Sequence, residues 1–246
     1  MIIIRGKKVL ISLGGTFEPI DSVRGITNRS SGKMGLSLAK QAYILGADVT
    51  LIVANVSVDI SPLFNVIPVE TSKEMANVIF EIIENYDIFI STAAVSDFEV
   101  VQPKNNKIDS ESSLSIDLKP TLKIIRQIKK INPNIFLVGF KAEFNITREE
   151  IISYAQKQIL DAGTDIVVAN DVSQNECGFW SDKNEVLIID SNDVLTVPLA
   201  SKDEIAKTIM DVISKRLSCR WAYLFYDFFI MSRIIFNFRY KIINLF

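Results

Sequence analysis

Apolar runs and helical patterns alternate along residues 8–217 of this chain. Each short apolar run, typical of a buried strand, is followed by a segment whose apolar residues recur at helical spacing. The first pair is KVLISL at residues 8–13 and the segment 32–47, which Gly46 is expected to end. Parallel strands joined by crossover helices require this order, so the sequence predicts an α/β fold with an open, doubly wound, mostly parallel sheet.

The same alternation predicts the remaining elements. Strands are expected at 48–54, 86–94, 134–143 and 165–171, and helices at 72–84, from about 121, at 147–163 and at 201–217. Ser72 is expected to cap its helix. Residues 184–199 alternate and turn at Ser191–Asn192, which predicts a C-terminal β-hairpin at the sheet edge. The polar segment 98–113 is expected to be a mobile loop.

Length and charge narrow the functions open to this chain. Its 246 residues, 48% of them apolar, can bury one large core, and a single domain over 1–217 is expected. The net charge of −2, with Lys and Arg dispersed among Asp and Glu, gives no basic patch for nucleic acid. The N-terminal apolar run is interrupted by Lys7 and Lys8 and lacks a small-residue cleavage site, so a first strand and a cytoplasmic location are expected.

The chain contains no histidine. This excludes Ser-His-Asp and Cys-His nucleophilic systems, His-based zinc sites and imidazole general bases. Cys177 and Cys219 match no metal or disulfide spacing. Phosphoryl and nucleotidyl transfer fit what remains, because they depend on positioning and charge neutralisation by Lys, Asn and backbone amides.

The loops that follow the strands carry the polar residues, at the edge where doubly wound sheets bind ligands. Gly14 and Gly15 would let backbone amides approach a phosphate, and Ser30, Ser31 and Gly32 would present donors at the positive start of a helix. The first loop is therefore predicted to be an anion cradle. The alternative is that Gly-Gly-Thr forms only a tight turn and Ser31 only a helix cap.

Several motifs, taken in order, resemble one known family. They are GGTFEPIDSVRGITNRSSGKMG at 14–35, TAAVSDF at 92–98, a Lys ten residues after Asp97, VGFKAE at 138–143 and DIVVAND at 165–171. Together they resemble phosphopantothenoylcysteine synthetase, the second half of the bifunctional coenzyme A biosynthesis protein of bacteria and archaea. The resemblance covers approximately residues 8–217.

The resemblance implies a ligase that joins 4'-phosphopantothenate to L-cysteine. It implies activation of the carboxylate as an acyl-nucleotidyl intermediate with release of pyrophosphate, CTP as the usual bacterial nucleoside triphosphate, and Mg²⁺. It also implies a modified Rossmann-like fold and a homodimer. The flavin-dependent decarboxylase half of the bifunctional members is not expected here, so a separate phosphopantothenoylcysteine decarboxylase is a candidate partner.

The resemblance also assigns roles to individual residues. By its motifs, Asn28 holds the acyl-nucleotidyl intermediate and Lys107 meets the triphosphate from a flexible loop. The nucleotide-binding element and the aromatic residue near the base correspond to Ala93, Ala94, Asp97 and Phe140. Arg24, with Asn28 and Ala94, is expected to contact the phosphopantothenate. No metal ligand is assigned.

The residue types suit these roles, although each has a structural alternative. Asn28 offers a donor and an acceptor without competing as a nucleophile, but it could be a turn residue in the left-handed region. Lys107 could be an ordinary surface lysine, and Asp97 a helix cap. Phe140 could be a core aromatic residue, and Arg24 could pair with Glu18 or Asp21.

Departures from the family pattern leave the nucleotide open. Asp109 stands where a second loop cation is common, and Leu122 and Lys123 replace a Pro-Asp pair. Gln158 and Ala162 occupy positions where the family usually has lysines. CTP is the first expectation and ATP the second. A catalytically impaired binding subunit is the main alternative function, and a nicotinamide-dependent oxidoreductase is weaker because the three-glycine fingerprint is missing.

The segment 218–246 has no counterpart in the resemblance. It is rich in aromatic residues and carries several cations but few anions. It fits a membrane-surface segment, but Asp227, Arg233 and Arg239 interrupt it too often for a membrane-spanning helix. The abrupt change of composition at Cys219 favours a segment outside the selected fold, such as translation beyond a disrupted stop.

Overall fold

One eight-stranded sheet organises the residues that the computed structural model describes, 4–111, 113–173 and 176–219. Its strand order is β12-β11-β10-β9-β6-β1-β4-β5. The strands are β1 (Lys8–Leu13), β4 (Asp48–Val53), β5 (Asn65–Pro68), β6 (Ile88–Ser91), β9 (Phe136–Glu143), β10 (Ile166–Asp171), β11 (Lys183–Ile189) and β12 (Val194–Ser201).

The six strands from β5 to β10 are parallel, as the alternating pattern predicts. β1 pairs with β4 on one side and with β6 on the other, so the order in which strands are added reverses between β1 and β6. β11 and β12 continue the sheet antiparallel and form the predicted C-terminal hairpin, with the turn between Ile189 and Val194.

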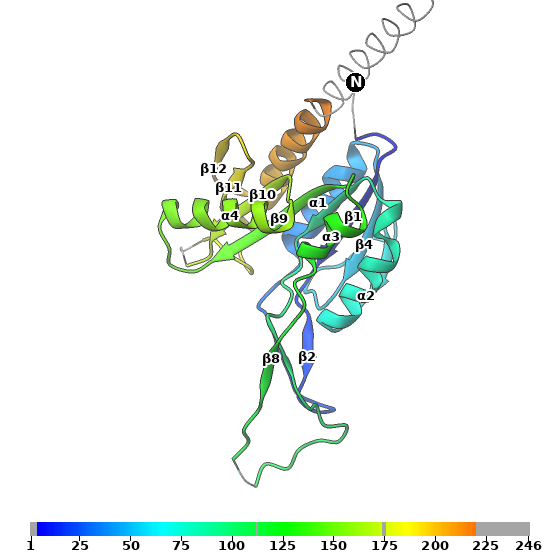
Figure 1. Ribbon diagram of the computed structural model, residues 1–246, viewed down its shortest axis with the longest axis vertical. Coiled ribbons are helices and arrows are strands. Elements are labelled where there is room, and N and C mark those ends of the chain that lie inside the picture. Colours follow the sequence, from blue (N-terminus) through cyan, green and yellow to red (C-terminus); the bar gives the residue numbers. More distant parts are fainter. Residues whose placement is uncertain (1–3, 112, 174–175, 220–246) are drawn as a thin grey trace, which may run out of the picture.

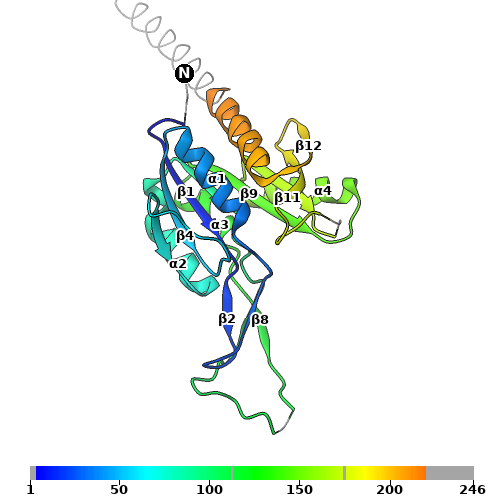
Figure 2. The same cartoon turned by 180° about the vertical axis from the view of Figure 1, so that it is seen from behind.

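Helices cover both faces of the sheet (Figures 1 and 2). One face carries α2 (Ser72–Ile82), α3 (Ile125–Ile131) and α4 (Arg148–Ala162), and the 3₁₀ turn η1 (Ile83–Asn85) follows α2. Figure 2 shows α1 (Lys33–Ile44) and the helical residues 202–219 side by side on the opposite face. The doubly wound α/β fold expected from the sequence is confirmed.

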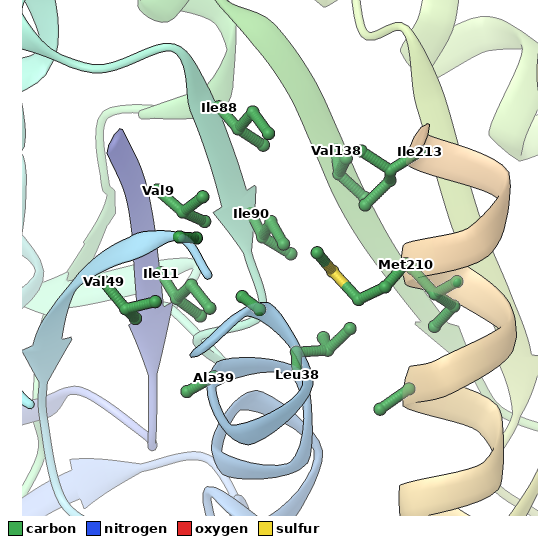
Figure 3. Packing of buried hydrophobic residues seen from close by; sticks show 14 of the residues in the cluster. Val9, Ile11, Leu38, Ala39, Val49, Ile88, Ile90, Val138, Met210 and Ile213 are labelled. Atoms are coloured by element: carbon green, nitrogen blue, oxygen red, sulfur yellow. The ribbon is translucent and has the colours of Figure 1, made fainter. Parts of the chain in front are cut away.

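Side chains of the central strands alternate between the two helical layers. Val9, Ile11 and Ile90 belong to the cluster that packs α1 and residues 202–219, whereas Leu10 and Phe89 face α2 and α3. These strands are therefore apolar on both faces, as strands in the middle of a parallel sheet must be. Figure 3 shows Met210 reaching from the last helix toward α1 and the sheet.

Capping explains where two of the helices begin. Thr71 and Glu74 form a capping box at α2, and Thr147 and Glu150 form one at α4. The expected cap at Ser72 is therefore wrong by one residue: Thr71 accepts the hydrogen bond from Glu74, and Ser72 is already helical. α3 also begins later than expected, at Ile125, because residues 121–123 are not helical and the Thr121 amide bonds instead to the Asp97 carbonyl of the third loop.

Two short hairpins form an arm that projects beyond the carboxyl edge of the sheet (Figures 1 and 2). They pair β2 (Phe17–Pro19) with β3 (Gly25–Thr27), and β7 (Phe98–Val100) with β8 (Leu118–Pro120). The expected loop at 98–113 therefore begins as a paired strand. Neither hairpin, nor the edge strand β5, was predicted, because strands of three or four residues are too short for a periodic pattern.

Residues 220–246 lie outside the described part of the chain, and so does nearly all of the predicted tail. The boundary at 217 stays a prediction, although helical structure continues to 219. Among the helices of the described ranges, none combines the length and the hydropathy that crossing a membrane demands.

Removing the Met210 side chain tests whether the last helix is part of the core. Met210 is fully buried, so Met210→Ala is expected to lower the free energy of unfolding by about 2–5 kcal/mol through lost packing and a residual cavity. Lys207→Ala on the exposed side of the same helix should change it by less than about 0.5 kcal/mol. Equal urea midpoints for Met210→Ala and the unmodified protein would contradict this packing.

Candidate functional site

A cleft of about 770 Å³ opens at the carboxyl edge of the sheet. It lies where the strand order reverses, between the loop after β1 and the loop after β6, and it extends to the ends of β9 and β10. Eight of the predicted site residues line it: Asn28, Ser30, Ser31, Gly32, Ala93, Ala94, Asp97 and Phe140. Gly14, Gly15, Arg24 and Lys107 are not among its lining residues.

Asn28 joins the first loop to the third. Its side-chain Nδ2 donates to the carbonyl oxygens of Ala94 and Val95, each at 3.2 Å. Its φ is negative, so the left-handed turn alternative is wrong. With both amide protons directed at these carbonyls, the side-chain Oδ1 of Asn28 is the atom that can accept a bond from a ligand.

The chain bends at Gly14, whose φ is 89°, and the next amides bond to neighbouring loops instead of closing a hydrogen-bonded tight turn. The Gly15 amide donates to the Asn55 carbonyl at 2.9 Å, and the Gly14 carbonyl accepts from the Ala94 amide at 2.8 Å. A Cβ atom at Gly15 would lie 2.7 Å from the Asn28 carbonyl oxygen, so only glycine allows this approach. In this structure, these glycines hold Asn28 and Ala94 in place; a direct contact with phosphate stays a prediction.

The first turn of α1 lines the cleft with Lys33, Met34 and Gly35. Gly32 is the N-cap, with no side-chain cap bond, so Ser31 is not the helix cap. A Cβ at Gly35 would lie 2.6 Å from the Cβ of Leu13, so glycine there lets α1 pack closely over the end of β1. The Lys33 amide already donates to the Ser31 hydroxyl oxygen at 3.5 Å, and the helix dipole favours an anion here. The Ser30 amide is already bound to the Asn28 carbonyl at 2.8 Å.

A strap of residues 178–182, in the connection from β10 to β11, lies against this helix start. The Ser31 hydroxyl donates to the Phe179 carbonyl. Lys33 Nζ donates to the Trp180 carbonyl at 3.0 Å and pairs with Asp182 at 2.6 Å. Lys202 Nζ, from the start of the last helix, donates to the Gly178 and Phe179 carbonyls at 3.0 and 3.3 Å.

Lys202 is an unusual cation because it is buried, with 6% of the residue exposed. Burial, and then the charge of Lys33, lower the pKa of Lys202 to about 8, while Asp182 opposes the shift. Positive charge is concentrated at this end of the cleft by Lys33, Lys202 and two helix N-termini. Asp182, which pairs with Lys33, carries the opposing negative charge. This end therefore suits an anionic ligand.

The other end of the cleft mixes apolar walls with charged side chains such as Lys157. Phe140, at the end of β9, lines the cleft from the face of α1, where it also packs on the core, whereas Ile125 and Tyr154 line it from the face of α3 and α4. Gln158 also lines this end, and its Nε2 is the one buried side-chain nitrogen or oxygen in the described ranges without a hydrogen-bond partner. Such walls suit a planar ligand with polar edges.

Asp97 lies at the rim of the cleft and forms an ion pair with Lys123. It does not cap α3, whose N-cap is Ile124, so that alternative is wrong. Ala93 and Ala94 bring the backbone of the third loop against the cleft. Asn170 and Asn184 line the floor, where Asn170 Nδ2 donates to Asn184 Oδ1 at 3.4 Å.

Arg24 and Lys107 belong to the arm. Arg24 pairs with the buried Asp21 at 2.6 Å and donates to the Ile108 carbonyl at 2.7 Å, so the ion-pair alternative is confirmed for this arginine. The Arg24 guanidinium and the Ile108 amide hold the pKa of Asp21 well below its usual range. Glu18 instead accepts from the Ser72 amide at 2.9 Å, at the start of α2. Lys107 is exposed, and the amide of the next residue, Ile108, donates to the Asp21 carboxylate at 3.1 Å.

No sequence pattern predicts the strap or the side chains that donate to it. Lys33 stood inside a quoted motif, but nothing local signals that it binds residues 147 or more positions away. Lys202 follows Ser201, and Ser201 with Glu204 has the spacing of a capping box, which predicts the helix start alone. Only the folded chain brings Lys33, Lys202 and the strap together.

The buried charge of Lys202 predicts a pH dependence of stability. Between pH 8 and the ordinary lysine value of 10.5 the unfolded state binds the proton more readily, so the free energy of unfolding should rise with pH in this window. From pH 8 to 10.5, the free energy of unfolding of the unmodified protein should increase by roughly 1–3 kcal/mol relative to that of Lys202→Met. Urea titrations of both proteins at several pH values would measure this. If the free energy of unfolding changed equally with pH in the two proteins, a buried cation would be contradicted.

Comparison with known proteins adds to this geometry. Residues 4–217 match the family described as the DNA/pantothenate metabolism flavoprotein C-terminal domain. The coenzyme A biosynthesis bifunctional protein CoaBC of Thermococcus kodakarensis is 44% identical over 216 residues. That alignment covers 87% of this chain and 52% of the relative, so the chain spans about half the length of this curated relative.

Solved structures agree with the fold. The crystal structure of the C-terminal domain of CoaBC matches with a TM-score of 0.73 at 30% identity, covering 87% of this chain and 97% of that one. The DNA/pantothenate metabolism flavoprotein from Streptococcus pneumoniae matches with a TM-score of 0.77 at 28% identity, covering 86% and 100%. With its fold, its cleft at the strand reversal and its sequence match over 4–217, the chain belongs to the DNA/pantothenate metabolism flavoprotein C-terminal domain family.

Proposed function

We propose that this domain is a ligase that condenses 4'-phosphopantothenate with L-cysteine to give 4'-phospho-N-pantothenoylcysteine in coenzyme A biosynthesis. The carboxylate attacks the α-phosphorus of a nucleoside triphosphate, and pyrophosphate leaves. The cysteine amine then attacks the acyl carbon, and the nucleoside monophosphate leaves. The relationship to the coenzyme A biosynthesis protein CoaBC supports the substrates, and the family match over residues 4–217 includes the motifs of the first and third loops.

The observation that carries this proposal is the link between Asn28 and Ala94 beside the start of α1. The Asn28 bonds to the Ala94 and Val95 carbonyls fix its Oδ1 within the cleft, where it can accept from an acyl-nucleotidyl intermediate without attacking it. The helix start lies in the same cleft, so a phosphate and a carboxylate could meet there. Bringing two anions together needs positive charge, which Lys33 supplies at this end of the cleft.

The two ends of the cleft favour one orientation of the nucleotide. The phosphates lie toward Ser31, Lys33 and the first amides of α1, and the base lies toward Phe140. CTP is the proposed nucleotide, and ATP is the second candidate. Gln158 lies at the base end of this arrangement, and its side-chain Nε2 has no hydrogen-bond partner. We expect this nitrogen to bond to the base and so to determine whether the site prefers CTP or ATP.

Mg²⁺ is proposed to arrive with the nucleotide. Over the described ranges, no three Asp, Glu, Cys or His side chains gather in a way that could hold a metal ion. Mg²⁺ commonly binds substrate phosphates with few protein ligands, so the donor set fits an ion held mainly by the triphosphate. When bound, the ion would neutralise phosphate charge.

A homodimer is proposed on the strength of the arm. Apolar side chains exposed along it are Val23, Phe98, Val101, Leu114, Ile116 and Leu118. An exposed apolar patch of this kind marks an interface more often than open surface. A dimer would also offer a second route by which Lys107 could meet a triphosphate. Sedimentation equilibrium giving 27.6 kDa at all concentrations would contradict the dimer.

Pyrophosphate release tests the ligase. Purified protein with 4'-phosphopantothenate, cysteine and Mg²⁺ should release pyrophosphate with CTP, and more slowly with ATP. Release should depend on phosphopantothenate, because its carboxylate is the attacking group. Folded protein that releases no pyrophosphate with either nucleotide, yet binds one of them tightly, would instead favour a non-catalytic subunit, and turnover of NADPH would favour an oxidoreductase.

Two substitutions separate the proposed roles. Asn28→Asp should lower the rate of product formation about 10²-fold or more, because an added carboxylate repels the anionic intermediate. Lys107→Gln should slow the first pyrophosphate-releasing step about tenfold or more, because a cation is lost from the triphosphate. Lys104→Gln, a loop lysine near Lys107, serves as the control. Single-turnover assays that find both variants equal to the unmodified protein would overturn the site.

A further inference from the structure

The strap, residues 178–182, is held by the buried side chain of Lys202. Lys202 lies in none of the motifs that the sequence predicts to form the site. Lys202 Nζ donates to the Gly178 carbonyl at 3.0 Å and to the Phe179 carbonyl at 3.3 Å. Lys202 begins the last helix, where the helix dipole is unfavourable for a cation. Burial at 6% exposure adds a desolvation cost, so its carbonyl partners must compensate.

The same strap continues to the donors of the phosphate end. The Phe179 carbonyl, which accepts from Lys202, also accepts from the hydroxyl of Ser31. The next carbonyl, that of Trp180, accepts from Lys33, and Asp182 pairs with Lys33 at 2.6 Å. Lys202 and the two donors at the start of α1 are therefore connected through five consecutive residues of backbone.

We infer that Lys202 is a positioning residue: it fixes the strap, and through the strap it orients Ser31 and Lys33 for binding the phosphates of the nucleotide. This rests on the proposed function for the identity of the ligand. Lys202 does not touch the reacting atoms. Its loss should weaken nucleotide binding and leave the chemical steps nearly unchanged.

Loss of Lys202 would leave the Gly178 carbonyl without its donor and the Phe179 carbonyl with the Ser31 hydroxyl alone. Buried polar groups that lose their partners are costly, so the strap should move until water reaches the Gly178 and Phe179 carbonyls. The Ser31 hydroxyl and the Lys33 ammonium would then lose the acceptors that fix their directions. Lys33 could still pair with Asp182 on a moved strap. Its ammonium group would then no longer have a defined position in the cleft.

The kinetic test compares three variants. Lys202→Met should raise the KM for the nucleotide about tenfold with kcat within about twofold, which corresponds to one charge-assisted hydrogen bond acting in binding. Lys202→Arg retains the cation and its donors, so it should restore much of the affinity. Lys207→Met, which removes an exposed lysine from the same helix, is the matched control and should behave as the unmodified protein does.

A second readout follows the strap itself and does not depend on the ligand. The chain has two tryptophans, Trp180 on the strap and Trp221, so Trp221→Phe makes Trp180 the sole indole. In that background, acrylamide should quench Trp180 more steeply in Lys202→Met than with Lys202 present, and Lys202→Arg should reverse the change. Far-ultraviolet circular dichroism establishes that each variant is folded.

The outcomes separate this inference from the proposed function. An unchanged nucleotide KM and unchanged Trp180 quenching in folded Lys202→Met would overturn the inference while leaving the ligase intact. A fall in kcat with an unchanged KM would also overturn it, because Lys202 would then act on the reaction. If the unmodified protein shows no ligase activity, the proposed function fails, and the inference fails with it only if Trp180 quenching is also unchanged.

Discussion

The reversal of strand order between β1 and β6 is the constraint on which the rest of this structure depends. Successive crossovers leave the sheet in opposite directions from these two strands, so the loops at their carboxyl ends part and leave a cleft. Each loop that carries a motif follows one of the parallel strands that meet at this edge. The chemistry is therefore gathered by topology, and the side chains act within a geometry that the sheet has already set.

Backbone hydrogen bonds then hold the loops together across the cleft. Gly15 approaches the Asn28 carbonyl as only a glycine can, and Asn28 bonds to the Ala94 and Val95 carbonyls. On the other side, the strap satisfies Ser31, Lys33 and Lys202 at the starts of two helices. One end of the cleft is thus electropositive, and the other, around Phe140, mixes apolar and charged side chains.

The sequence predicted the features that local patterns encode and missed those that depend on distant contacts. Strand β1, the hairpin turn after Ile189 and the helix ended by Gly163 follow from periodicity and capping. The loops around Asn28 and Ala94 were recognised as parts of a site, but their mutual hydrogen bonds were not foreseeable. Lys202 and the strap were invisible, since no short-range signal joins residue 202 to residues 178 and 179. For Arg24 the sequence left open an ion pair or a contact with substrate. Only the fold shows that Arg24 pairs with Asp21 and donates to the Ile108 carbonyl.

A crystal structure of the protein with CTP, Mg²⁺ and 4'-phosphopantothenate tests the central claim most directly, because that claim concerns where the ligands lie. The account predicts triphosphate density within hydrogen-bond reach of the amides that begin α1 and of Lys33, with the base beside Phe140 and the Asn28 Oδ1 near the phosphopantothenate carboxyl group. Nucleotide density outside the cleft between β1 and β6, or with the base at the α1 start and the phosphates at Phe140, would contradict it.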